Sequence, residues 1–234
     1  MPYNHKTYIK PEVKMYDLIC ENQCFLLFLQ HFNIDFSVDN KTIEQICNEN
    51  GYSLNAFMAI ANLYNDFFPE PGKEYSIADL ETVLKFLKNN HHFYLSEKYP
   101  DLLQYINQLS ESHTGDDIKL IRKFFADYFN EVKEHMNYED TNVFPYINSL
   151  IQNIKYESKF AARVYKEHHS DIETKLTDLR SFFLRHLQIP NNLSTKRQFL
   201  RSLKELEFDL TLHSRIEELI LIPIVEQIEL SQNG

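Results

Sequence analysis

The sequence predicts an all-α protein, an antiparallel up-down four-helix bundle preceded by a small helical module. Three observations lead to this prediction. The chain of 234 residues contains only 4 glycines, and glycine-poor chains with long periodic segments favour helices over turn-rich β structure. In four long segments after residue 76, apolar residues recur at alternating spacings of three and four, the repeat of an amphipathic helix. The loops between these segments are short, as they are in up-down bundles.

Residues 1–68 are expected to form the small leading module, which contains three short helices. Their expected ranges are 17–32, 41–49 and 54–66. Asn40 is expected to cap the second helix, with Gly51 just after its end, and Ser53 is expected to cap the third. The stretch 67–72 contains two prolines that break the helical pattern, so it is taken as the linker.

Residues 76–232 are expected to form the bundle. Its four helices are expected over residues 76–109, 118 to beyond 139, 156–186 and 195–230. Ser76 opens the first helix, and Asp79 stands three residues later in the capping-box position. Pro100 is expected to interrupt this helix because proline removes a backbone donor.

Charge and composition exclude several classes of protein. The formal net charge of −10 disfavours nucleic-acid binding, because phosphate repels an acidic chain. No apolar run approaches the roughly 20 residues of a membrane-spanning helix, and the polar stretch 1–16 has no signal-peptide core. Cys20, Cys24 and Cys47 make an odd count without zinc-type pairing, so a cytoplasmic location with reduced, core-packed thiols is expected. The oligomeric state is left open.

Two predicted helices each interrupt an apolar stripe with a histidine and, four residues later, a glutamate. These pairs are His135 with Glu139 and His213 with Glu217. The first stripe contains Ile121, Phe125, Tyr128, Val132, His135 and Glu139; the second contains Leu203, Leu206, Leu210, His213, Glu217, Ile220 and Ile224. Because residues three and four apart share a helix face, each pair is expected to point into the bundle core.

Buried glutamates in these positions favour a metal centre. An ionised carboxylate in a dry core is costly unless it is paired or bound to metal, and two of them on facing helices would also repel each other. A single inward His–Glu pair is more often a buried ion pair, but two pairs in register favour metal ligation. Imidazole with carboxylate suits iron, manganese or zinc, and an oxygen-bridged pair suits iron best.

The two remaining helices also carry histidines. His168 lies on the apolar face of the third helix, whereas His169 lies 100° away. The first helix offers His91 and His92, and helical phase favours His91 because it continues the series Leu80, Leu84, Leu87. The histidines at 5, 31, 113 and 186 are interpreted as surface or structural residues.

Several motifs resemble those of a known family. The segment 135–140, HMNYED, followed by Val143-Phe144-Pro145, resembles the signature of hemerythrin-like proteins. It resembles more closely the di-iron proteins for repair of iron–sulfur clusters, also called regulators of cell morphogenesis and nitric-oxide signalling. The motifs at 91–102, Glu167-His168 and His213 with Glu217 and Pro223 are similar to that family's. The leading module resembles its small N-terminal domain, but residues 37–40 replace the paired cysteines.

The resemblance implies the ligands of the centre. It implies two iron ions, oxygen-bridged, with four histidines as terminal ligands and two glutamates as bridges: His92, His135, His168, His213, Glu139 and Glu217. Measured back from Pro100, the family motif selects His92 where helical phase favours His91, and the motif is followed here.

The resemblance also implies a function. We expect a di-iron protein of the nitrosative or oxidative stress response that binds or reacts with nitric oxide or oxygen. It would support the repair of iron–sulfur clusters, with damaged iron–sulfur proteins as partners. The alternative is an oxygen or nitric-oxide sensor or carrier, or an iron-delivery protein, without catalytic turnover. The sequence leaves open whether the protein is an enzyme.

Overall fold

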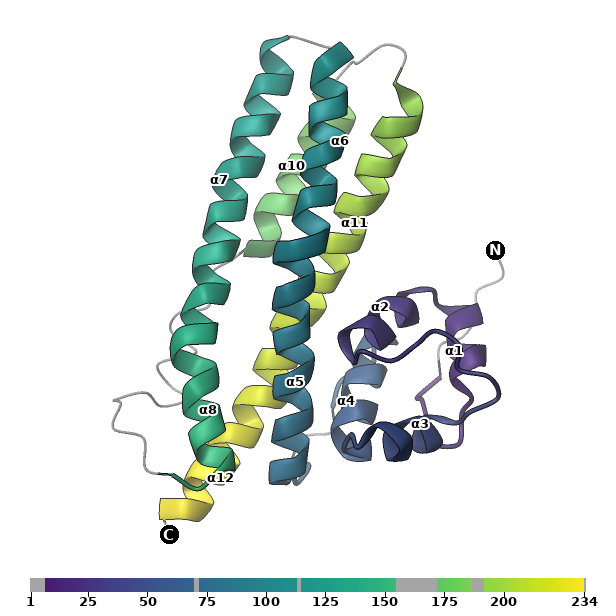
Figure 1. The fold of residues 1–234 in the computed structure, drawn as a ribbon, viewed down its shortest axis with the longest axis vertical. Coiled ribbons are helices and arrows are strands. Elements are labelled where there is room, and N and C mark those ends of the chain that lie inside the picture. The colour runs from purple at the N-terminus through teal and green to yellow at the C-terminus, as the bar shows by residue number, and fades with distance from the viewer. Residues whose placement is uncertain (1–6, 70–71, 113–114, 155–171, 187–191, 234) are drawn as a thin grey trace. The chain divides into compact units, whose positions relative to one another are not determined.

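The computed structural model describes residues 7–69, 72–112, 115–154, 172–186 and 192–233. These residues form helices joined by loops (Figure 1), and their only extended pairing is an isolated bridge between Lys14 and Thr42. The predicted all-α fold is therefore confirmed. Within the described ranges, the helices are too short or too polar to span a membrane.

The chain divides into two compact units. Unit 1 contains the described residues within Met1–Asn90, Val143–Glu167 and Leu212–Gly234, and unit 2 contains those within His91–Asn142 and His168–Thr211. This division is not the division of the sequence into residues 1–68 and 76–232, which stays a prediction.

Unit 1 begins with α1 (Met15–Glu21) and α2 (Cys24–His31). The prediction of one continuous helix over 17–32 is wrong, because the helix is interrupted at Asn22. The side-chain oxygen of Asn22 accepts a hydrogen bond from the backbone N–H of Cys24 at 3.1 Å, and its amide donates to the carbonyl of Tyr64 at 3.2 Å. An asparagine that bonds nearby backbone in this way competes with the helix.

The next two helices are α3 (Ile43–Asn50) and α4 (Leu54–Tyr64). Thr42, not Asn40, caps α3: its side chain accepts from the backbone N–H of Gln45, whose side chain accepts from Thr42 in return. Gly51 ends α3 in the left-handed conformation, with φ 68°, as predicted for a glycine at this position.

Ser53 precedes α4 but makes no side-chain bond to it. Its hydroxyl instead donates to Asp79 at 2.5 Å, at the start of α5 (Ile77–Phe93). The predicted capping box of α5 is confirmed, because the backbone N–H of Ser76 donates to Asp79 at 2.7 Å and Asp79 N–H donates back at 3.3 Å. Burial alone would raise the pKa of Asp79, but the hydrogen bonds from Ser53 and Ser76 hold it below its usual value.

The core of unit 1 is aromatic and joins the leading helices to α5. Phe28 and Phe32 on and after α2, Phe57 on α4 and Phe86 on α5 are fully or almost fully buried. The ring of Phe32 lies 4.4 Å from that of Phe57 and 4.8 Å from that of Phe86. Each such ring pair stabilises the folded state by about 0.5–1.5 kcal/mol beyond the burial of apolar area. Phe86 therefore packs α5 against the leading helices.

Unit 1 also contains α8 (Phe144–Ile151) and α12 (Ile222–Asn233), which pack against each other. The hydroxyl of Tyr146 on α8 donates to Glu229 on α12 at 2.5 Å. Burial, then this carboxylate, raises the pKa of Tyr146.

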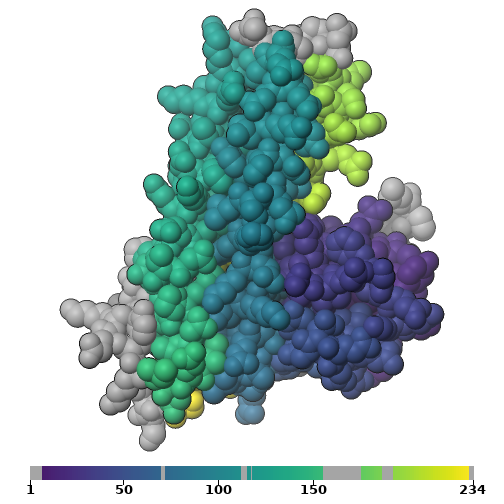
Figure 2. Space-filling model, in the orientation of Figure 1, coloured from purple at the N-terminus to yellow at the C-terminus, as the bar shows by residue number. Residues whose placement is uncertain are grey.

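Unit 2 contains α6 (Tyr99–Ser112), α7 (Asp116–Tyr138), α10 (Ile172–His186) and most of α11 (Leu193–Ile216). Figure 1 shows these four helices side by side, and α6 and α10 both pack on α7. In Figure 2 the teal side chains of α6 and α7 cover one face of this unit. Short connections make α6 antiparallel to α7, and α10 antiparallel to α11, as in the predicted up-down arrangement.

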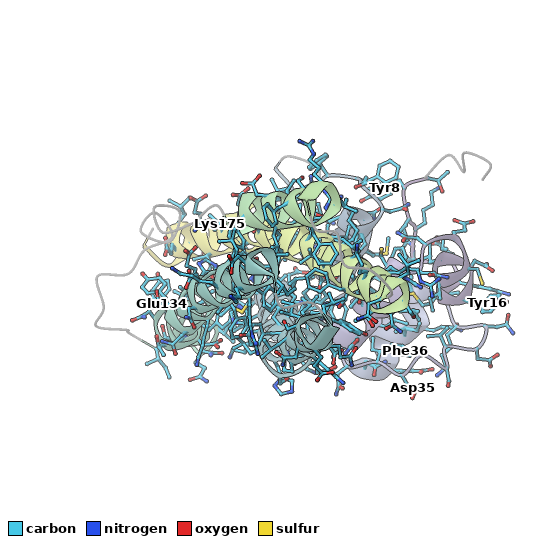
Figure 3. The ribbon with its side chains drawn as sticks, turned by 90° about the horizontal axis from the view of Figure 1, so that it is seen from above. Tyr8, Tyr16, Asp35, Phe36, Glu134 and Lys175 are labelled. Atoms are coloured by element: carbon cyan, nitrogen blue, oxygen red, sulfur yellow. The ribbon has the colours of Figure 1, made fainter. Side chains whose placement is uncertain are left out.

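The predicted stripes are buried. In the α7 stripe, every apolar residue from Ile121 to Val132 is at most 3% exposed, and the α11 stripe is buried from Leu203 onward. The opposite faces carry charge: Figure 3 shows Glu134 and Lys175 on the outer side of α7 and α10, where Lys175 pairs with Glu131. The spacing of apolar residues therefore set the inward face of these helices correctly.

Candidate metal centre

In unit 2, two imidazoles meet one buried carboxylate. Glu139 follows the last turn of α7, and its side chain is 0% exposed. One of its oxygens, Oε1, lies 3.2 Å from Nε2 of His135, and the other, Oε2, lies 3.1 Å from Nε2 of His91. Each oxygen of Glu139 thus faces a different imidazole. A carboxylate placed in this way is suited to bridge two cations.

In unit 1, His213 and Glu217 form a second buried pair. Nε2 of His213 lies 3.2 Å from Oε1 of Glu217, and the two side chains are 3% and 0% exposed. The four-residue spacing on the helix brings the two side chains together. This pair has the same spacing and the same separation as His135 with Glu139.

The second nitrogen of two imidazoles also has a neighbour. Nδ1 of His91 lies 3.0 Å from a carboxylate oxygen of Asp140, and Nδ1 of His213 lies 3.4 Å from the side-chain oxygen of Asn90. An acceptor at Nδ1 favours the tautomer with hydrogen on that nitrogen, so the lone pair of Nε2 is directed at the glutamates. Partners of this kind commonly orient histidines that bind metal.

The structure places His91, and not His92, against Glu139. His91 is 2% exposed, whereas His92 is exposed on the outer face of α5. Helical phase selected His91, and the count back from Pro100 selected His92. A π-helical turn, η1 (Tyr94–Lys98), lies between the histidines and Pro100, so the count crosses an irregular turn, whereas helical phase is read within α5. The widened turn changes the phase only after His91.

The part of the chain that the structure describes contains three such π turns, and they share one relation to proline. They are η1, η2 (Glu139–Val143) and η3 (Glu217–Leu221), and each begins six residues before a proline: Pro100, Pro145 and Pro223. A proline in a helix cannot bond the carbonyl four residues earlier and its ring crowds that carbonyl. The residue four positions before each proline is the central residue of the π turn. The widened turn therefore relieves the clash between the proline ring and the carbonyl of that residue.

This relation positions both predicted bridging residues. Glu139 and Glu217 are each the first residue of a π turn, at the point where the helix widens. In η3 the N–H of Ile222 bonds the carbonyl of Glu217, five residues earlier. π turns inside α-helices occur frequently at functional sites. This feature was not predicted, although the repeated six-residue offset to proline is visible in the sequence.

Among the described residues, groups that could hold a metal ion are drawn from five side chains: His91, His135, Glu139, His213 and Glu217. His168 lies outside the described residues, and so do His5 and His113. His31 is 0% exposed and its ring lies 5.4 Å from that of Phe86, which agrees with a structural role.

The donor atoms fit a metal site. Two ligand atoms that each lie about 2.1 Å from one cation at a right angle are about 3.0 Å apart, and the imidazole–carboxylate separations here are 3.1–3.2 Å. Imidazole nitrogen with carboxylate oxygen is a donor set for iron, manganese or zinc.

The thiols do not belong to this donor set. Burial raises the pKa of Cys47 to about 12, which keeps it a protonated thiol, and metal ligation needs the thiolate. Cys20 is exposed and Cys24 is half-buried, so the expectation that all three cysteines pack in the core holds only for Cys47.

Comparison with protein families adds one finding. The family model described as "Hemerythrin HHE cation binding domain" matches residues 82–225, which is more than half of the chain. The matched range includes all five of these side chains as well as His92 and His168. Among curated proteins, none matches this sequence.

Proposed function

Because the chain belongs to the hemerythrin HHE cation-binding domain family, we propose that it is a di-iron protein. The proposed ligands are His91, His135, Glu139, His168, His213 and Glu217. Five of them are taken from the described structure, and His168 is taken from the sequence. His91 replaces His92, the residue that the motif implied.

The single observation that carries this proposal is the placement of Glu139. Its two oxygens face two different imidazoles, and it is fully buried. A structural ion pair needs only one partner, whereas a bridge between two cations needs both oxygens directed at separate sites. The charge of two cations would also offset the high cost of burying the ionised carboxylate.

The proposal brings the His213–Glu217 pair into the same centre. The family match runs without interruption from residue 82 to residue 225, so it contains both His–Glu pairs within one domain model. The two pairs also share their four-residue spacing, a fully buried glutamate and the position of that glutamate at the start of a π turn. These likenesses support equivalent roles for Glu139 and Glu217, as the two bridging carboxylates.

Each residue has a defined part in this arrangement. Glu139 and Glu217 supply negative charge that screens the cations from each other. Asp140 and Asn90 orient His91 and His213 through their Nδ1 atoms. The apolar stripes on either side limit access of water. Bound iron would supply an exchangeable coordination position and a change of oxidation state, and these are what the binding of oxygen or nitric oxide requires.

We infer that the small ligand is oxygen or nitric oxide and that the protein acts in the nitrosative or oxidative stress response, supporting repair of iron–sulfur clusters in damaged proteins. The support for this finer function is the likeness of the motifs at 91–102 and 135–145 to the repair family. The odd cysteine count favours the cytoplasm. The second candidate is a sensor, carrier or iron donor with the same centre.

Elemental analysis after anaerobic reconstitution with ferrous iron tests the centre. We expect two iron atoms per chain, and one or fewer would overturn the di-iron proposal. Consumption of nitric oxide over many cycles, with a reductant present, would favour an enzyme. One reversible equivalent per centre would favour the sensor or carrier.

A further inference from the structure

A small cavity lies in unit 2, between η1, α6, α7 and α11. Its lining includes Tyr94 on η1, Tyr128 and Val132 on α7, and Leu206 and Leu210 on α11. Apart from the tyrosines the lining is apolar. The cavity has a volume of about 10 Å³, which is room for about one water-sized molecule.

The cavity lies one helical turn from the imidazoles of His91 and His135. Val132 precedes His135 by three residues on the inward face of α7, and Tyr94 follows His91 by three residues. At a rise of 1.5 Å per residue, each offset is about 4.5 Å along the helix axis. On both helices, the residue that lines the cavity thus lies one turn from a candidate ligand of this unit.

Tyr94 occupies in η1 the position that Glu139 and Glu217 occupy in η2 and η3. It is 2% exposed, it is the first residue of η1, and it stands six residues before Pro100. Glu139 and Glu217 occupy the same position in η2 and η3. Where those turns present a carboxylate, η1 presents a phenol, which can donate a hydrogen bond.

Tyr128 also lines the cavity and is 3% exposed, but it lies further from the ligand layer. It precedes His135 by seven residues, about 10.5 Å along the helix axis. The two buried phenols thus differ mainly in their distance from the imidazoles, which makes Tyr128 a matched control for Tyr94.

We propose that the cavity holds a diatomic ligand beside the centre and that the phenol of Tyr94 donates a hydrogen bond to it. Tyr94 is then a determinant of the affinity for the diatomic ligand. This inference rests on the proposed di-iron centre and adds to it a residue that is not among its ligands.

The experiment compares iron-loaded wild type, Tyr94→Phe and Tyr128→Phe, with nitric oxide as the probe. Iron content and circular dichroism are measured first. The dissociation rate of nitric oxide is then followed by its optical spectrum after addition of a trapping agent. We expect two iron atoms in all three proteins and dissociation about tenfold faster in Tyr94→Phe only, because one hydrogen bond is lost.

The outcomes separate the two proposals. Wild type without iron would overturn the proposed function and, with it, this inference. Iron-loaded Tyr94→Phe that releases nitric oxide at the wild-type rate, or a larger effect in Tyr128→Phe, would overturn the role of Tyr94 alone. Loss of iron, or of a phenolate-to-iron absorption band, from a folded Tyr94→Phe protein would make Tyr94 a ligand and would also contradict the hydrogen-bond role.

A second variant tests the cavity without changing Tyr94. Val132→Phe fills the space beside the imidazoles with a larger apolar side chain and leaves the phenol in place. We expect this variant to keep its iron and to bind nitric oxide at least tenfold more weakly. Wild-type affinity for nitric oxide in iron-loaded Val132→Phe would show that the ligand does not occupy this cavity.

Discussion

Replacing Glu139 by glutamine should leave the stability of the metal-free protein nearly unchanged. It should remove most of the stabilisation that bound iron gives. The substitution keeps the volume of the side chain, so no cavity forms. One oxygen becomes an NH₂ group that faces an imidazole nitrogen at about the present separations of 3.1 and 3.2 Å and can donate a hydrogen bond to it. The metal-free variant should therefore unfold at the wild-type temperature or slightly above, because a buried charge has been removed.

The loaded protein should behave in the opposite way, because glutamine cannot bridge two cations. A metal present at 100 times its dissociation constant stabilises the native state by about 2.7 kcal/mol. For a chain of this size, each kcal/mol shifts the melting temperature by about 2–4 °C. Iron should therefore raise the melting temperature of wild type by about 5–11 °C and that of Glu139→Gln by much less.

The assay is thermal unfolding followed by circular dichroism, with and without ferrous iron under anaerobic conditions, together with iron analysis. Glu131→Gln is the matched control: Glu131 lies eight residues earlier on α7, is half-exposed and pairs with Lys175. An exposed pair contributes at most about 1 kcal/mol, so this variant should keep the full response to iron. A full response in Glu139→Gln, with two iron atoms bound, would refute the bridging role.

Three further outcomes are expected. Iron analysis should show that His91→Ala loses iron and His92→Ala keeps it, since only His91 faces Glu139; the reverse result would restore the motif-based choice. At pH 8, iodoacetamide should modify Cys20 in the native protein and leave Cys47 unmodified, because burial raises the pKa of Cys47 to about 12, and peptide mass analysis would detect a contrary result. Asp79→Asn should destabilise the protein by about 1–2 kcal/mol at neutral pH by weakening the cap of α5. Because the pKa of Asp79 is lowered by folding, its contribution is present above the unfolded-state pKa and is lost as the pH falls through the folded-state pKa; urea unfolding at pH 7 and pH 3 should show the difference between wild type and variant shrinking in acid.

Much of the candidate centre was visible in the sequence because helix geometry is local. The spacing of three and four residues fixes which side chains share a face. The stripes from Ile121 to Glu139 and from Leu203 to Glu217 therefore predicted the inward direction of both His–Glu pairs and the burial of both glutamates. The position of His91 also followed from this rule, through its phase with Leu87.

Two predictions about the leading helices were wrong where a local hydrogen bond competed with the expected helix boundary. Asn22 bonds the backbone on both sides of a break between α1 and α2, a contact that the apolar pattern does not encode. Thr42 replaces Asn40 as a cap because Gln45 returns its hydrogen bond. The choice between His91 and His92 stays a prediction: the count back from Pro100 crosses the π turn η1, and the structure places His91 against Glu139.

The sequence by itself determined the all-α fold, the inward face of each bundle helix and the identity of the two buried glutamates. All of these depend on spacing along one helix. Only the tertiary structure decided that both oxygens of Glu139 face imidazoles, one on its own helix and one on α5. It also decided that Tyr94 lines a cavity with Val132 and Leu210. Periodicity sets the direction of a side chain from its own axis, but packing between helices sets what that side chain meets.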